Sequence, residues 1–68
     1  MKAVTGKELA RVLGRHGWRR LRISGSHHVY GKPGSVARLS VPIHAGRTLK
    51  AGLTAHLLKA AGLREEDL

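Results

Sequence analysis

The chain has 68 residues, which is enough for one domain with a small core. Lys and Arg total 13 against 4 Asp and Glu, and the net charge of +9 favours a polyanionic partner, because each phosphate contact releases counterions. Cysteine is absent, which excludes disulfides, zinc fingers and thiol catalysis. Since no apolar run is long enough for a membrane span or a signal peptide, we expect a single cytoplasmic domain over residues 1–68.

Capping signals at both ends predict a first helix over residues 6–16. Thr5 and Glu8 have the spacing of a capping box, in which each side chain accepts a hydrogen bond from the backbone N–H of the other residue. Apolar side chains follow at helical spacing: Leu9, Val12 and Leu13. Gly17 predicts a left-handed C-cap, after which Trp18 can pack back onto the last turn.

Three strands are expected next, at residues 18–24, 27–30 and 37–41. In the first and third, apolar residues alternate with polar or basic ones, which is the pattern of a half-buried strand. Gly25 and Ser26 predict a two-residue type II′ turn between the first two strands, because glycine tolerates a positive φ. A flexible connection containing Pro33 leads to the third strand, and Pro42 ends it.

A basic loop at residues 44–50 precedes a second helix, expected over residues 52–61. Its apolar side chains share one stripe: Leu53, Leu57, Leu58 and Ala61. Gly62 predicts another C-cap, and residues 64–68 form a short acidic tail. The predicted fold class is α+β, in the order α-β-β-β-α, with a three-stranded antiparallel sheet. One apolar stripe on each helix predicts that both helices cover the same face.

Strand pairing around the turn separates two neighbouring histidines. The expected pairs are Ser24–His27, Ile23–His28, Arg22–Val29 and Leu21–Tyr30. Directly paired residues share a face, so His28 is expected on the core side with Leu21. His27 is expected on the face away from the helices, which we call the open face, together with Arg20 and Arg22. This placement depends on a two-residue turn, since a bulged turn would reverse the parity.

An exposed histidine among arginines is compatible with RNA cleavage or with RNA binding alone. A histidine can take the proton of an RNA 2′-hydroxyl or protonate the leaving oxygen, while guanidinium groups stabilise the phosphate. Three of the four acidic residues lie in the tail, too few elsewhere for two-metal cleavage. His27 and His28 point to opposite faces and do not share a metal ion. A nuclease here would therefore use no metal or cofactor; a non-catalytic RNA-binding module and a structural ribosome-associated protein are the alternatives.

Several other residues have two possible roles. The candidate phosphate contacts are Arg20, Arg22, Lys32 and Arg38. Gly25 and Ser26 are turn formers, although the Ser26 hydroxyl could also bind a phosphate. Trp18 and Tyr30 are expected to pack rather than to stack on bases. His44 fits two roles equally well, as a second group beside the substrate or as the end of the third strand.

The chain resembles the HicA (YcfA-like) mRNA interferase toxins over nearly its whole length. The matching segments are Gly17-Trp18, the block from Gly25 to Tyr30, the run from Leu39 to His44, and the run from Leu57 to Leu63. The resemblance implies a fold like the double-stranded RNA-binding domain, cleavage of mRNA, inhibition of translation and a HicB-like antitoxin partner. It places the catalytic role on His27, directly after Gly25-Ser26, with His28 as a supporting residue. Ala51-Gly52-Leu53 stands where the family often has proline, glycine and threonine, a departure at the start of the second helix.

Overall fold

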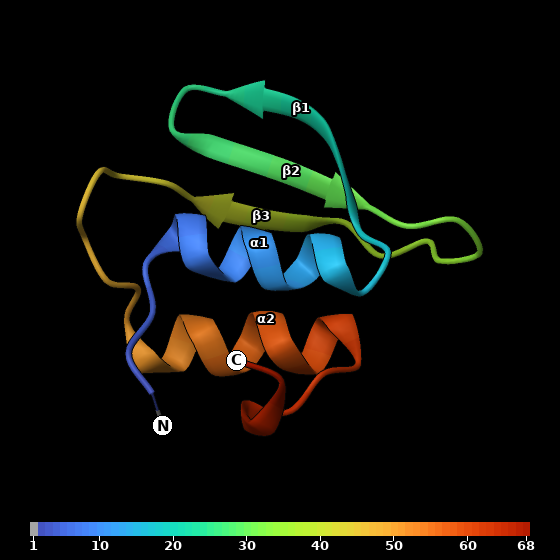
Figure 1. Cartoon of the computed structure of the whole chain (residues 1–68). Coiled ribbons are helices and arrows are strands. Elements are labelled where there is room, and N and C mark those ends of the chain that lie inside the picture. The colour runs from blue at the N-terminus through green and yellow to red at the C-terminus, as the bar shows by residue number, and fades with distance from the viewer. Residues whose placement is uncertain (1) are drawn as a thin grey trace.

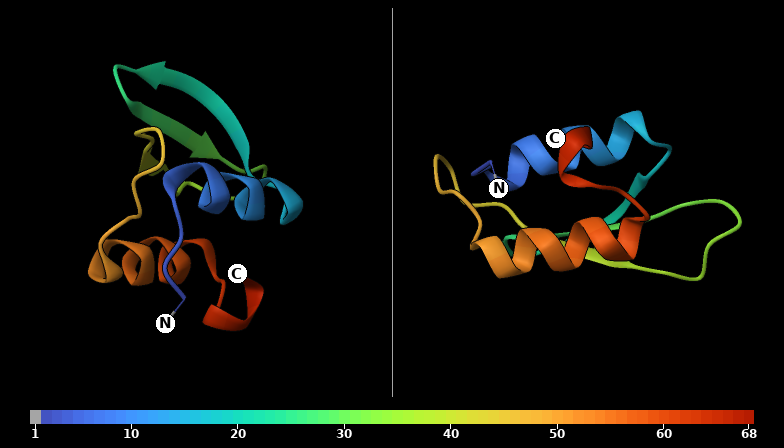
Figure 2. Two further views of the ribbon diagram at one scale, coloured as in Figure 1. Left: turned by 60° about the vertical axis from the view of Figure 1, so that its left-hand side comes forward. Right: turned by 90° about the horizontal axis from the view of Figure 1, so that it is seen from below.

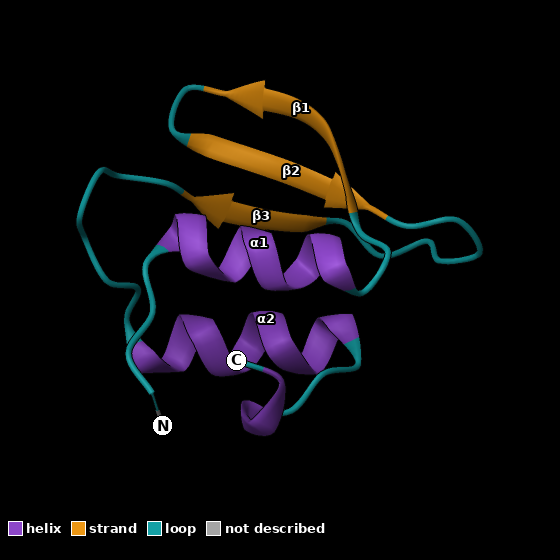
Figure 3. Cartoon of the chain, viewed as in Figure 1, coloured by secondary structure: helices purple, strands orange, loops and turns teal. Residues whose placement is uncertain are grey.

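The computed structural model describes residues 2–68 and places two helices on one side of a three-stranded antiparallel sheet (Figure 1, Figure 3). In chain order its elements are α1 (Gly6–Arg15), β1 (Arg19–Ser24), β2 (His27–Gly31), β3 (Leu39–Pro42), α2 (Ala51–Ala61) and the short 3-10 helix η1 (Glu65–Asp67). The strands lie across the sheet in the order β1-β2-β3. This confirms the predicted α+β class and element order. Met1, which the predicted domain includes, lies outside the described residues.

Both ends of α1 follow its capping signals. The Glu8 N–H donates to Thr5 Oγ1 at 3.1 Å and the Thr5 N–H donates to Glu8 Oε1 at 2.8 Å, which completes the capping box. The hydrogen bond from the Thr5 backbone favours the carboxylate and lowers the pKa of Glu8. At the other end Gly17 has a φ of 93° and the Trp18 N–H donates to the Leu13 carbonyl at 3.0 Å. The helix ends one residue earlier than predicted.

The core lies between the helices and the part of the sheet nearest to them. Its buried side chains come from both helices, from β2 and β3 and from the adjoining segments: Val4, Leu9, Leu13, Trp18, Tyr30, Leu39, Val41, Leu57 and Leu58. Both helices lie beside β3, and neither lies beneath β1 (Figure 2). Trp18 and Tyr30 are buried, as predicted.

β1 extends beyond the helical layer, and this makes part of the predicted core wrong. Leu21 and Ile23, both expected on the core side, are 52% and 51% exposed. All the other residues of β1 are exposed as well. Alternating apolar residues indicate a strand, but they do not say what covers it, because cover depends on where the helices dock.

A β-bulge at Leu21 also changes the predicted register. The pairs nearest the turn are as predicted, but Arg20 rather than Leu21 pairs with Tyr30. Because Tyr30 packs in the core, Arg20 lies on the helix side of the sheet and not on the open face. Leu21 turns to the open face, where a side-chain carbon built at Gly31 would lie only 2.7 Å from Leu21 Cδ1.

β3 begins at Leu39, two residues later than predicted. Arg38 belongs to the preceding loop instead, and its guanidinium donates to the Ala37 carbonyl at 2.9 Å. At the other end of β3, the Pro42 carbonyl lies so close to Gly6 that a side chain at position 6 would collide with it. The start of α1 therefore packs against the end of β3, where Pro42 pairs with His27.

α2 begins at Ala51, one residue before its predicted start, and Gly62 caps its end with a φ of 73°. Its apolar face is as expected, with Leu57 and Leu58 buried. The prediction missed Thr54, which is also buried. Its hydroxyl donates to the Lys50 carbonyl at 3.3 Å, so this buried polar group has a partner.

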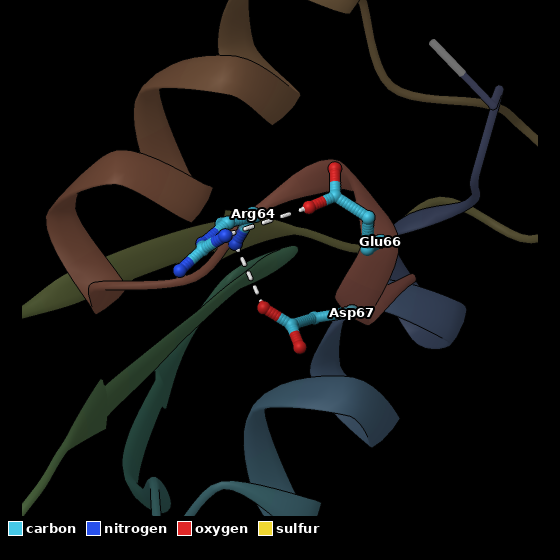
Figure 4. Close-up of polar contacts among 3 residues, drawn as sticks. All are labelled: Arg64, Glu66 and Asp67. Atoms are coloured by element: carbon cyan, nitrogen blue, oxygen red, sulfur yellow. Dashed lines mark hydrogen bonds and ion pairs between the residues drawn. The ribbon is translucent and has the colours of Figure 1, made fainter.

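The acidic tail forms η1 on the side of the helices away from the sheet (Figure 1). The Arg64 N–H donates to Asp67 Oδ2 at 2.8 Å, and the Arg64 guanidinium lies 3.9 Å from a Glu66 carboxylate oxygen (Figure 4). Leu68 packs against the core. Among residues 2–68 no helix has both the length and the apolar character needed to cross a membrane.

Candidate functional site

His27 lies at the first position of β2, immediately after the hairpin turn, and its side chain is exposed. It pairs with Ser24 of β1 and with Pro42 of β3. Its neighbour His28 pairs with Val41, whose side chain is in the core. Since successive strand residues point to opposite sides, His27 faces away from the helices, as predicted.

The His27 ring lies beside a serine hydroxyl of β3. Its Nδ1 lies 3.2 Å from Ser40 Oγ, within hydrogen-bonding distance. Ser40 is on β3, where it pairs with Val29, so it shares the open face with His27. The hydroxyl orients the imidazole of an exposed side chain through Nδ1. A ring held in this way can accept or donate a proton at Nε2.

The turn before His27 brings a second histidine to the same place. Gly25 has a φ of 59°, while no non-glycine residue among residues 2–68 has a positive φ, so the turn fits type II′ and not type I′. Ser26 Oγ lies 3.4 Å from His44 Nε2. The Ile43 N–H also donates to the Ser26 carbonyl at 2.8 Å. The segment after β3 is therefore attached to the turn through backbone and side chain.

His28 lies on the helix side, as predicted, and is only half-buried. It pairs with Ile23 of β1 and with Val41 of β3. The strand pleat therefore separates it from His27, and the two rings do not act on one substrate atom or one ion.

Apart from Arg20, which lies on the helix side, the predicted basic residues divide between two places. Arg22 pairs with Val29 and lies on the open face, two residues from His27 along the adjoining strand. Lys32 and Arg38 lie at the other end of β2, roughly 13–17 Å away at about 3.3 Å per strand residue. The Lys32 ammonium there lies 5.8 Å from the centroid of the Trp18 ring.

A shallow depression of about 390 Å³ marks this far end of the open face. Its lining combines basic and apolar residues: Arg19, Leu21, Gly31, Lys32, Pro33 and Arg38. Arg19 pairs with Gly31 and so takes the open-face position that the prediction gave to Arg20. The bulge at Leu21 is the cause, because it reverses the parity of every residue before it.

Ser40 and Arg19 are polar residues of this face that the sequence analysis did not place there. Ser40 lies between Leu39 and Val41, which are buried. This alternation of polar and apolar residues indicates that Ser40 is on the open face. Its contact with His27 depends on the β2–β3 register, which the intervening loop leaves undetermined. In residues 2–68 no three His, Asp or Glu side chains gather into a group that could hold a metal ion.

A search of curated proteins found no significant match. Comparison with family models matched residues 6–63 to the family described as "HicA toxin of bacterial toxin-antitoxin". The matched span begins at the first residue of α1 and ends just after α2, so it includes all three strands, the hairpin turn, His27 and His44. The chain belongs to the HicA toxin family of bacterial toxin–antitoxin systems.

Proposed function

We propose that this toxin is a metal-independent endoribonuclease that cleaves mRNA in the cytoplasm and so inhibits translation. The observation that carries the proposal is the state of His27. The ring is exposed on the open face, with Nδ1 bonded to Ser40 Oγ at 3.2 Å and Nε2 free to meet a substrate. Membership of the HicA family supports the toxin role to which this chemistry would contribute.

The proposed reaction uses the RNA's own 2′-hydroxyl as nucleophile. An imidazole takes the 2′-proton as the oxygen attacks the adjacent phosphorus. The bond to the 5′-oxygen breaks, and that oxygen receives a proton. The products are a 2′,3′-cyclic phosphate and a 5′-hydroxyl. His27 acts as general acid–base, and cationic side chains stabilise the charge on the phosphate.

Basic side chains along the open face support a path for the RNA backbone. Arg22 lies beside His27, while Arg19, Lys32 and Arg38 surround the depression at the far end. These four residues are the proposed phosphate contacts, and they replace the predicted set that contained Arg20. A single strand crossing the sheet would meet positive charge at both ends, with the reacting phosphate at the His27 end.

The family also implies an antitoxin partner for this chain. We propose a HicB-like protein that covers the open face, where it would exclude RNA sterically and compete for the same cations. Because the helices leave this face uncovered, the antitoxin needs no rearrangement of the fold to reach His27.

Incubation of the purified protein with RNA in EDTA tests the proposal, with a His27→Ala variant beside it. The wild type should cleave, and the variant should lose about 10²–10⁴-fold in rate, the usual contribution of a general acid or base. RNA affinity should change little, because the positive charge along the face remains. His56→Ala is the matched control, since His56 is an exposed histidine on α2.

Two outcomes would oppose this proposal. Equal cleavage by the wild type and His27→Ala would remove His27 from the mechanism. Intact RNA in both samples, with binding retained, would favour a non-catalytic RNA-binding module of the same fold.

A further inference from the structure

We propose that His44 is a second catalytic residue, which shares proton transfer with His27 in one reaction. The inference rests on the nuclease function proposed above and deepens it. It starts from the contact between His44 Nε2 and Ser26 Oγ at 3.4 Å, which attaches this histidine to the turn that also positions His27.

The backbone brings the two histidines to the same turn. His27 pairs with Pro42, and the Ile43 N–H donates to the Ser26 carbonyl at 2.8 Å, which continues the pairing one residue beyond β3. Ile43 packs against the core. His44 follows Ile43 in the loop after β3, and its ring reaches the hairpin turn at Ser26, the residue before His27.

The spacing suits a phosphate between the rings. His44 stands diagonally across from His27, two positions beyond its partner Pro42. Such diagonal positions are about 7–8 Å apart in a sheet, a separation that aromatic and long side chains can still bridge. On the other side of His27, Ser40 occupies the equivalent diagonal position and holds Nδ1. His27 therefore has an orienting hydroxyl on one side and a second imidazole on the other.

The reaction needs two proton transfers at opposite ends of the phosphorus. One group takes the proton from the 2′-oxygen as its bond to phosphorus forms, and another gives a proton to the 5′-oxygen as its bond to phosphorus breaks. The attacking and leaving oxygens are in line, so two groups on either side of the phosphate reach them better than one. One of the two histidines acts as the base and the other as the acid. After the step the base is protonated and the acid is neutral.

The surroundings of His44 also favour a phosphate. A depression of about 280 Å³ lies beside it, and besides His44 it is lined by the cations Arg47 and Lys50 and by Pro42, Thr48, Leu49 and Leu53. Arg47 and Lys50 are the charged residues of this lining. Ser26 holds Nε2, which leaves Nδ1 of His44 for the substrate.

His44→Gln tests this role, because the amide can still bond to Ser26 but cannot transfer a proton. Single-turnover cleavage rates would be measured from pH 5 to 9 for the wild type, His44→Gln and the control His56→Gln, together with RNA affinity and melting temperature. We expect His44→Gln to lose about 10²–10⁴-fold in rate. RNA affinity and melting temperature should stay unchanged. The bell-shaped pH profile of the wild type should lose one limb, since one of its two titrating groups is gone.

A wild-type rate for His44→Gln would overturn the inference, as would a slow variant that keeps both limbs of the profile. A rate that falls only in step with RNA affinity or melting temperature would show a structural role and overturn it too. The His27→Ala variant distinguishes a failure of the inference about His44 from a failure of the proposed nuclease function. If His27→Ala is inactive and His44→Gln is not, the nuclease site stands and only His44 is lost. The proposed function fails if the wild type does not cleave RNA, or if His27→Ala cleaves RNA as fast as the wild type. In either case this inference fails with it.

Discussion

At the scale of single residues, the proposed chemistry depends on how two exposed imidazoles are oriented by hydrogen bonds. His27 and His44 are both exposed, and each has one ring nitrogen within reach of a serine hydroxyl. A hydroxyl can donate or accept, so Ser40 can bond to His27 in either protonation state. A histidine that acts as a base in one step and as an acid in another can therefore keep its hydrogen bond to the hydroxyl throughout.

Ser40→Ala removes the hydroxyl that orients His27. One hydrogen bond of this type contributes about 1 kcal/mol, so cleavage should slow roughly five- to tenfold. RNA affinity should be unchanged, because no charge is altered. Ser40→Thr keeps the hydroxyl and suits a strand, so it should restore most of the rate. Equal rates for the wild type and Ser40→Ala, measured in single turnover, would show that the Ser40 contact does not position the ring.

At the scale of elements, the sequence predicted local features well and tertiary ones poorly. The capping box, the glycine caps and the two-residue turn each depend on neighbouring residues, and all three are present. The position of His27 followed from the turn alone. The bulge at Leu21 and the exposure of β1 depend on which strand the helices cover, and the contact of His44 with Ser26 depends on the β2–β3 register. Patterns among neighbouring residues in the sequence do not determine these three tertiary features.

The bulge yields a matched pair of variants. Arg22 lies on the open face and Arg20 on the helix side, and both are exposed arginines of β1. Arg22→Gln and Arg20→Gln remove the same charge from opposite sides. We expect Arg22→Gln to weaken RNA binding and to reduce the slope of log affinity against log salt by about 0.7, the value for one phosphate contact on a single strand.

Salt titrations of RNA binding would check this expectation. Arg20→Gln should change the slope less, because its charge does not face the proposed path. Equal slopes for the two variants would show that RNA does not discriminate between the two sides of β1.

At the scale of the whole molecule, the fold leaves one side of a small sheet without cover. Both helices and the acidic tail lie on the other side, while basic residues line the open face. Three of the four acidic residues are in η1, beyond the helices. The basic residues on the open face favour the binding of a polyanion there. The family's antitoxin partnership gives a reason for such a surface to remain uncovered within the toxin itself.

The most direct test of this account is the chemistry of the cut ends. A defined RNA would be cleaved by the wild-type protein in EDTA, and the 3′ ends of the products would be analysed. The account predicts 2′,3′-cyclic phosphate ends, and no cleavage where a 2′-O-methyl group blocks the nucleophile. Products with a 3′-hydroxyl and a 5′-phosphate, or cleavage at a 2′-O-methyl nucleotide, would mean that another nucleophile attacks, and would contradict it.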